Sequence, residues 1–261
     1  IAGVASHPNI RLYTLSEVAD TSGYVGNFKV SINRKASCVD ISKCNQCWLC
    51  LKSCPVSQRS DYDCGLSNRG AIYLPYPEAY PSYPVVDRQT CLHFKGEACQ
   101  ACVEVCPRGA INMSQQNEIK EETVGAIIVA TGYGLFPQDG ISEYASDLDV
   151  LDGLQFERLL SPSGPTKGEI RRPSDGKVPR ELVFIQCVGS RDPEHGVPYC
   201  SRICCMNTAK QARLYKRAVP DGQAYVFYMD VRSDAKGYEE YLKKVVDEER
   251  EVIDPLPQRR Q

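Results

Sequence analysis

The sequence lacks the features of a membrane-spanning, secreted or nucleic-acid-binding protein. It contains no run of eighteen apolar residues and no secretory signal pattern. Its 31 lysines and arginines nearly balance 33 aspartates and glutamates, for a net charge of −2, and they form no basic stripe. The three histidines do not have the spacing of metal ligands. We therefore expect a cytoplasmic protein that binds no nucleic acid and does not span a membrane.

Cysteine, in contrast, is abundant, and twelve of the fourteen cysteines fall into three groups of four. The first two groups have the spacings C-x2-C-x2-C-x3-C and C-x7-C-x2-C-x3-C, each followed by proline, and the third is C-x12-C-x3-C-C. In chain order the groups are Cys44, Cys47, Cys50 and Cys54; Cys91, Cys99, Cys102 and Cys106; and Cys187, Cys200, Cys204 and Cys205. Each group has the make-up of an iron–sulfur site.

Two other uses of these cysteines have to be weighed. Disulfide frameworks belong to small secreted domains with too little core, whereas 261 residues with 42% hydrophobic content can bury a sizeable core. Zinc is the stronger rival, because paired C-x2-C elements form zinc ribbons. Zinc ribbons, however, use separated pairs, and not three thiolates in close succession followed by a fourth and a proline. The spacing favours iron–sulfur clusters, with zinc as the open alternative.

The first two groups have the form of the bacterial ferredoxin run, in which the fourth cysteine binds the other cluster of the pair. Three thiolates on a tight loop can each hold one iron corner of a cube, while the following helix carries the fourth away. We therefore predict two 4Fe-4S clusters whose fourth ligands cross between the halves. The first cluster is assigned to Cys44, Cys47, Cys50 and Cys106, and the second to Cys91, Cys99, Cys102 and Cys54.

An internal repeat supports this assignment. Val39-Asp40 and Val86-Asp87 stand at the same distance before the first cysteine of their halves. Each half closes with Arg-Gly-Ala-Ile, at residues 69–72 and 108–111, and the first half carries an insertion before this motif. The Tyr/Pro-rich stretch from Tyr73 to Pro84 predicts an extended connection between the halves.

Outside this region, alternating polar and apolar residues predict short strands around Arg11–Thr14 and Asn27–Ser31. The continuous apolar run from Val124 to Gly132 predicts a buried strand. Its small terminal residues would let a ligand approach the backbone. An ordinary buried parallel strand is the alternative.

Farther along, a Pro/Gly/Ser-rich stretch within residues 161–176 predicts an interdomain connection. A strand at Leu182–Ile185, a helix at Ser201–Lys216 and a strand at Tyr225–Val231 predict a βαβ half of a dinucleotide-binding fold. The loop where G-x-G-x-x-G would cradle a pyrophosphate carries Gly189 and the third cysteine group. This arrangement suggests that a metal cluster has replaced the dinucleotide.

The third group has an alternative interpretation. Neighbouring side chains on a helix point about 100° apart. Cys204 and Cys205 can therefore serve one cube only if the helix begins there. Otherwise, Cys187 and one of the pair are buried small hydrophobic residues. Cys38 and Cys64 belong to no motif and are expected to be structural.

Several long motifs, found in one order along nearly the whole chain, resemble the A subunit of heterodisulfide reductase. They are His7–Ile10 with Thr14–Val18, Gly23–Phe28, Phe156–Leu160, Arg172–Lys177, Phe184–Asp192 and Tyr199–Met206. The final stretch, Glu251–Gln261, matches less well.

The resemblance implies an α/β iron–sulfur flavoprotein with a thioredoxin-reductase-like scaffold of FAD/NAD-type, Rossmann-like domains. An α+β ferredoxin domain of the bacterial two-cluster type would be inserted into it. Residues 1–36 would form part of the FAD-type domain, 37–115 the inserted ferredoxin, and 116–150 the return to the FAD-type domain. Residues 151–261 would form an NAD-domain-like Rossmann half, in which the third cysteine group binds a further 4Fe-4S cluster in that family.

The resemblance also implies contacts with FAD. Ala130, Thr131 and Gly132 match the A-T-G segment that runs beside FAD in such reductases. Val18 stands where the adenine-contacting backbone of the family is expected. The family's G-x-G-x-x-G turn for the FAD phosphates is missing, so the chain is expected to be a central fragment of a longer protein. By itself it is expected to bind FAD poorly or not at all.

On this resemblance, the chain is an oxidoreductase component that relays electrons through 4Fe-4S clusters and contributes no catalytic residue of its own. The implied partners are a hydrogenase or formate dehydrogenase module, ferredoxin, and heterodisulfide reductase subunits of the B and C types. Related subunits serve sulfate-reduction and aromatic-ring-reduction complexes. The alternative from another class is a non-enzymatic metal-binding module, for example one stabilised by zinc, that docks partner proteins.

Overall fold

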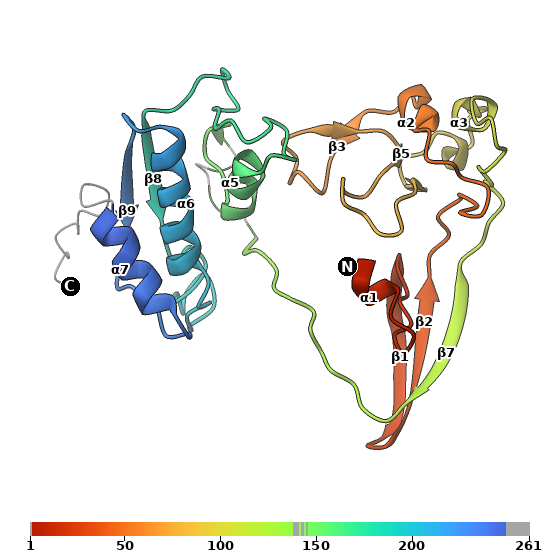
Figure 1. Ribbon diagram of the computed structural model, residues 1–261, viewed down its shortest axis with the longest axis horizontal. Helices are drawn as coiled ribbons and strands as arrows, with labels where there is room; N and C mark the ends of the chain where they lie inside the picture. The colour runs from red at the N-terminus through yellow and green to blue at the C-terminus, as the bar shows by residue number, and fades with distance from the viewer. Residues whose placement is uncertain (1, 138–140, 142–143, 145, 249–261) are drawn as a thin grey trace. The chain divides into compact units, whose positions relative to one another are not determined.

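The computed structural model describes residues 2–137, 141, 144 and 146–248. Two compact units divide the chain: one comprises residues 1–62 and 68–132, and the other comprises residues 63–67 and 133–261. Parts of the predicted segments 116–150 and 151–261, including the stretch 251–261, lie outside the described residues. Both units mix helices with small sheets (Figure 1), which confirms the predicted α/β class.

An antiparallel three-stranded sheet forms part of the first unit, after the short helix α1 (Ala2–Ala5). Its order is β1 (Ser16–Tyr24), β2 (Asn27–Arg34) and β7 (Glu118–Val124), as Figure 1 shows. Two residues connect β1 to β2, and the second, Gly26, has a φ of +91°, which glycine adopts without steric cost. The strand predicted at Asn27–Ser31 is therefore confirmed as the first part of β2.

The strand predicted at Arg11–Thr14 is wrong, because this segment is irregular. The Arg11 guanidinium donates to the Glu122 carboxylate on β7 at 2.9 Å, and the Tyr13 hydroxyl donates to the same oxygen. The alternation of residue types thus reflects side-chain contacts with the sheet, and not backbone pairing within it.

The buried strand predicted from Val124 to Gly132 is also wrong. Strand β7 ends at Val124, and the apolar residues that follow are irregular and exposed, with Ile128 at 91% and Val129 at 78%. A strand that is apolar on both faces needs neighbouring strands and covering layers. In the described part of the chain, no strand pairs with residues 126–132.

Short elements enclose the first two cysteine groups in a cysteine-rich module, residues 37–115. Two helices lie within the cysteine groups, and small hairpins and one 3-10 turn complete the module. The elements are α2 (Leu49–Ser53), β3 (Gln58–Arg59), β4 (Asn68–Arg69), β5 (Ile72–Tyr73), β6 (Val85–Val86), η1 (His93–Lys95) and α3 (Ala101–Glu104). Strand β3 pairs with β4, and β5 pairs with β6. Buried cysteines form part of this core together with small aliphatic residues.

The two halves of the module make the same backbone contacts. Val39, near the start of the first half, pairs with Ile111 at the end of the second half. Val86, near the start of the second half, pairs with Ile72 at the end of the first half. The matching hydrogen bonds run from Asp40 N–H to Ala110 O and from Asp87 N–H to Ala71 O, each at 2.7 Å. The first half is thus closed by the end of the second, and the second half by the end of the first.

The second unit contains a parallel βαβ arrangement. The named elements of this unit are α5 (Gly153–Leu160), β8 (Glu181–Ile185), α6 (Cys204–Ala218), β9 (Gln223–Phe227) and α7 (Tyr238–Glu248). Strands β8 and β9 pair in parallel, and α6 lies between them in sequence (Figure 1). The strand predicted at residues 182–185 and the helix predicted at residues 201–216 are confirmed. The strand predicted at residues 225–231 is confirmed only as far as Phe227.

Aromatic side chains hold this βαβ arrangement together. The rings of Phe156 on α5 and Phe184 on β8 meet edge to face, with their centroids 5.7 Å apart. Tyr215 on α6 is fully buried, and its hydroxyl donates to the Pro179 carbonyl at 3.0 Å. Burial of side chains of this size stabilises the fold by about 1.5–3 kcal/mol each. No helix in the described ranges is both long and apolar enough to cross a membrane.

Residues 63–67 come from the insertion of the cysteine-rich module but belong to the second unit. Arg158 on α5 donates to the Asp63 carboxylate at 3.0 Å, and the two side chains are only 13% and 14% exposed. Gln155 donates to the Cys64 carbonyl at 3.1 Å. Gln155 also completes a capping box with Asp152, which fixes the start of α5.

Candidate metal centres

The first predicted ligand set lines one cavity. Cys44, Cys47, Cys50 and Cys106 line it together with Trp48 and other residues. Cys106 comes from the second half of the module, as the crossed assignment requires. Cys47 is exposed and stands between Gln46 and Trp48, whose φ angles of +58° and +60° are left-handed. The tight loop thereby presents Cys47 outward.

The second predicted set lines a separate cavity. Its four cysteines are Cys54, Cys91, Cys99 and Cys102, and here Cys54 is contributed by the first half. The rest of the lining is almost entirely apolar, with Val86, Leu92 and Met113 among its residues. None of these four cysteines is exposed, whereas the first set has one that is.

The two crossing cysteines accept equivalent backbone hydrogen bonds. The N–H of Ala71 donates to Cys54 Sγ, and the N–H of Ala110 donates to Cys106 Sγ, each at 3.3 Å. Burial alone would raise the pKa of Cys106, but N–H groups from Arg108 to Ile111 outweigh it and lower that pKa. The repeated Arg-Gly-Ala-Ile motif thus stabilises a thiolate at this position.

The thiols deeper in the module are hard to ionise without a cation. The pKa of Cys50 is raised to about 11, chiefly by burial and also by the charges of Cys44 and Cys106. Burial raises the pKa of Cys102 to about 12, again with neighbouring cysteines contributing. Thiolates crowded into one cavity repel each other, and a bound metal removes this repulsion. The donor set and the apolar walls suit a thiolate-bound cluster.

The third cysteine group lies where β8 leads toward α6. Cys187 follows β8 with a φ of +62°, and Arg202 turns the chain with a φ of +61° just before the helix. Helix α6 begins at Cys204, and Cys205 in its first turn is buried. The helix therefore starts at the adjacent pair, which is the condition for both cysteines to face one cluster.

Electrostatic interactions link the cysteines of this group in pairs. The pKa of Cys187 is raised to about 11, chiefly by burial and then by interactions with Cys204 and Cys205. Burial also raises the pKa of Cys205, with further contributions from Cys204 and Cys200. Charge interactions weaken with distance, so Cys187 and Cys205 lie within interaction range of these partners.

Backbone groups at this site favour negative charge. The N–H of Arg202 donates to Cys200 Sγ at 3.3 Å, and the N–H of Arg232 donates to Cys205 Sγ at 3.4 Å. The positive end of the α6 dipole lies at Cys204 and Cys205. A helix start at this point of a βαβ unit binds pyrophosphate in dinucleotide-binding folds. The same field suits an anionic cluster.

All fourteen cysteines are free thiols. No group of three His, Cys, Asp or Glu side chains in the described ranges is arranged to hold a single metal ion. In a cubic cluster each thiolate binds a different iron, so the ligands do not have to converge on one point.

Comparison with known proteins places the chain in a family, although no family model matches the sequence. It is 42% identical over 243 residues to the A subunit of the H(2):CoB-CoM heterodisulfide,ferredoxin reductase of Methanothermobacter marburgensis, covering 92% of this chain and 36% of that protein. It is 45% identical over 243 residues to the second of two iron–sulfur A subunits of the CoB--CoM heterodisulfide reductase of Methanopyrus kandleri, with the same coverages. Over this stretch, the chain belongs to the family of heterodisulfide reductase A subunits.

A relative from Methanocaldococcus jannaschii, the iron–sulfur A subunit of CoB--CoM heterodisulfide reductase, is 43% identical over 246 residues, which are 94% of this chain. The alignment covers 37% of that protein. The chain therefore spans about a third of the length of these heterodisulfide reductase subunits. All three are named as subunits of a reductase, and the Methanocaldococcus jannaschii and Methanopyrus kandleri proteins are named as iron–sulfur subunits, in agreement with the resemblance on the sequence.

The residues that the family resemblance assigns to FAD lie apart from both cavities. Val18 is an exposed residue of β1, next to a register shift in its pairing with β2. Ala130, Thr131 and Gly132 lie in the exposed segment after β7. Neither cavity is lined by any of these four residues.

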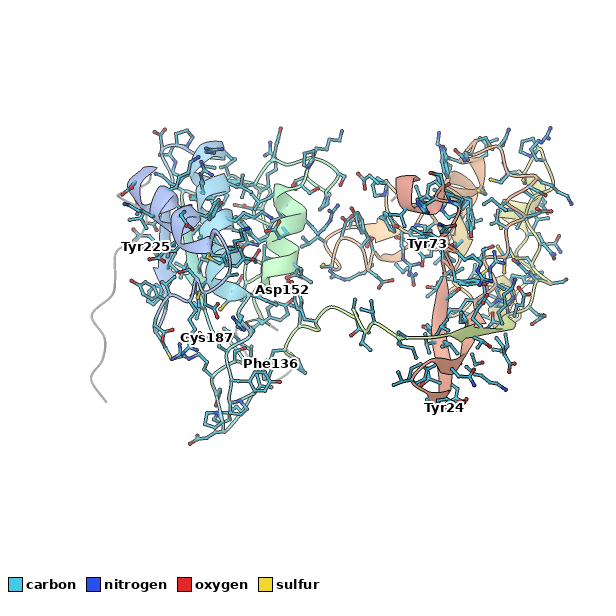
Figure 2. All side chains as sticks on the ribbon, turned by 60° about the horizontal axis from the view of Figure 1, so that its bottom comes forward. Tyr24, Tyr73, Phe136, Asp152, Cys187 and Tyr225 are labelled. Atoms are coloured by element: carbon cyan, nitrogen blue, oxygen red, sulfur yellow. The ribbon has the colours of Figure 1, made fainter. Side chains whose placement is uncertain are left out.

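Two glycines near the cysteines leave room for close packing that the sequence did not predict. A Cβ atom on Gly70 would lie 3.0 Å from Cys54 Cβ and 3.2 Å from its Sγ, so this glycine allows close approach to a predicted ligand. A Cβ on Gly189 would overlap the ring of Phe136, which covers the loop after Cys187 (Figure 2). The repetition of Arg-Gly-Ala-Ile was the available signal for Gly70, whereas nothing local indicated Phe136.

Proposed function

We propose that this chain is an electron-transfer segment of a heterodisulfide-reductase-type complex and holds three 4Fe-4S clusters. The observation that carries the proposal is the composition of the two cavities. Each is lined by the three closely spaced cysteines of one half and by the fourth cysteine of the other half. This is the ligand pattern of two-cluster ferredoxins. When bound, each cluster accepts and donates one electron at a time.

In this proposal, the residues of the chain hold and insulate the clusters. The first cavity binds its cluster through Cys44, Cys47, Cys50 and Cys106, the second through Cys54, Cys91, Cys99 and Cys102, and the third site through Cys187, Cys200, Cys204 and Cys205. Backbone N–H groups donate to the sulfurs and favour the anionic state. Apolar residues such as Leu92 and Met113 limit water at the second site. The exposed Cys47 makes the first site the more accessible of the two.

The partners in the proposal are a hydrogenase or formate dehydrogenase module, ferredoxin, and subunits of the B and C types, which would carry out the disulfide chemistry. One relative belongs by name to an H(2)/formate-linked heterodisulfide,ferredoxin reductase, and another to a ferredoxin- and F(420)H(2)-dependent heterodisulfide reductase. These names support the same classes of donor and acceptor here.

We further propose that this chain alone binds FAD weakly or not at all. The described residues contain no G-x-G-x-x-G turn, and Val18 and residues 130–132 are exposed. Flavin fluorescence after denaturation of the purified protein measures the bound FAD. About one flavin per chain would contradict this part of the proposal.

Metal analysis of anaerobically purified protein tests the central claim. Three clusters correspond to about twelve irons with equimolar labile sulfide, and two clusters correspond to about eight. Stoichiometric zinc without sulfide would refute the redox function and favour a zinc-stabilised docking module. A Cys205→Ser variant is expected to lose one EPR-detectable cluster and keep the other two.

A further inference from the structure

Asp230, in the loop after β9, contacts both Arg191 and Cys205 of the third cysteine group. Its carboxylate accepts hydrogen bonds from Arg191 Nη1 at 2.5 Å and from Arg232 Nε at 3.3 Å. Its carbonyl oxygen lies 3.8 Å from Cys205 Sγ, and the N–H of Arg232 donates to the same sulfur at 3.4 Å. The backbone of this segment therefore contacts Cys205, while the Asp230 side chain holds Arg191.

Arg191 in turn contacts Cys187. The Arg191 side chain forms a hydrogen bond with the Cys187 side chain, and their charges interact. Asp230 links this cation to the segment that contacts Cys205.

Arg191 also has the least exposed side chain of the three arginines Arg191, Arg202 and Arg232. Its side chain is 22% exposed, compared with 46% for Arg232 and 65% for Arg202. Water and salt screen exposed charges far more than shielded ones. Among these three arginines, Arg191 therefore carries the charge that solvent screens least.

The backbone fixes Arg191 in this place. Its φ is +59°, a left-handed conformation that costs energy in a residue other than glycine. Its N–H donates to the Tyr199 carbonyl at 3.1 Å, which ties the loop after Cys187 to the residue before Cys200. A strained conformation persists only where the surroundings hold it, so the guanidinium is anchored at both its backbone and its tip.

We propose that Arg191 tunes the reduction potential of a cluster bound by the third cysteine group, and that Asp230 is the positioning residue that holds Arg191 for this role. The inference rests on the proposed function, because it requires a cluster at that group. Reduction adds negative charge to the cluster, and a fixed cation stabilises the reduced form more than the oxidised form. Removal of the Arg191 charge therefore favours the oxidised form.

EPR-monitored redox titration of the anaerobically purified protein tests the tuning role. The signal of the third cluster is the one that disappears in Cys205→Ser. Arg191→Gln is expected to lower the ratio of reduced to oxidised cluster about tenfold at a given potential, which is 59 mV for a one-electron couple. Arg191→Lys keeps the charge, and Arg202→Gln removes a more exposed one, so each should shift the potential less than half as far. An unchanged potential in Arg191→Gln would overturn the proposal.

An Asp230→Asn background tests the positioning role. If Asp230 holds Arg191 near the cluster, the shift caused by Arg191→Gln should fall by at least half in that background. Equal shifts in both backgrounds would show that Asp230 does not position Arg191. If Arg191→Gln loses the third cluster outright, retention of the cluster in Arg191→Lys supports the charge effect, and loss in both variants overturns it. A wild-type protein with only two clusters would refute the third site itself, and this inference with it.

Discussion

A methyl group on Gly70 should damage one cluster site and spare the other. Its Cβ would meet Cys54 Cβ at 3.0 Å, the Ile72 carbonyl at 3.1 Å and Cys54 Sγ at 3.2 Å. These contacts are tighter than ordinary van der Waals contacts, so Cys54 or the backbone has to move by a few tenths of an ångström. Overpacking of this kind costs about 1–3 kcal/mol. Because Cys54 is the crossing ligand predicted for the second site, the displacement falls on that site.

The equivalent glycine of the repeat provides a matched control. Gly109 has open space around its missing Cβ, but its φ of +56° is left-handed. Gly109→Ala therefore costs about 1–2 kcal/mol through backbone conformation, with no contact against a cysteine. The two variants should have similar stabilities in denaturant melts and different effects on the clusters.

Iron content and EPR spectra distinguish the two variants. Gly70→Ala is expected to lose up to about four irons per chain and the signal that Cys102→Ser also removes. Gly109→Ala is expected to keep its iron and all of its signals. Full iron content in Gly70→Ala, or equal losses in the two variants, would refute the reasoning from the Cβ contact.

Three further outcomes are expected. Gly189→Ala should destabilise the second unit by about 3 kcal/mol in denaturant melts, because its Cβ would overlap the Phe136 ring; a change below about 1 kcal/mol would contradict that contact. Arg158→Ala should remove the ion pair with Asp63 and speed proteolysis within residues 63–67, and an unchanged cleavage rate would contradict the anchoring of this segment. In the metal-free protein, the raised pKa of Cys187 contributes stability that is complete below pH 9.0 and is lost as pH rises through about 11; Cys187→Ser should flatten this alkaline limb.

The composition of both cavities could be predicted because ligand spacing is local information. Three cysteines within seven residues in the first half, or within twelve in the second, have to lie on one loop, and the duplicated Arg-Gly-Ala-Ile motif marks where each half closes. The crossing of Cys54 and Cys106 followed from the known form of two-cluster ferredoxins. The βαβ unit was predictable for a similar reason, because its two apolar strands and its helix have distinct patterns.

Features that depend on distant partners could not be predicted in the same way. The apolar run at residues 127–129 has the composition of a buried strand, but burial depends on neighbours that a single segment does not encode. The same holds for Arg11 and Tyr13, whose shared partner Glu122 is more than 100 residues away. Residues 63–67 join the second unit through Arg158, and no local pattern indicates that contact.

The crossed arrangement of the cysteine-rich module has a consequence for biosynthesis. Cys44, Cys47 and Cys50 are synthesised first, yet the cavity that they line also needs Cys106, the last of the eight. The second cavity takes Cys54 from the first half, and its lining extends to Met113 near the end of the second. A nascent chain that ends before residue 111 therefore lacks part of both cavities. We expect the module to fold only after its second half has been synthesised, so that neither half holds a complete ligand set alone.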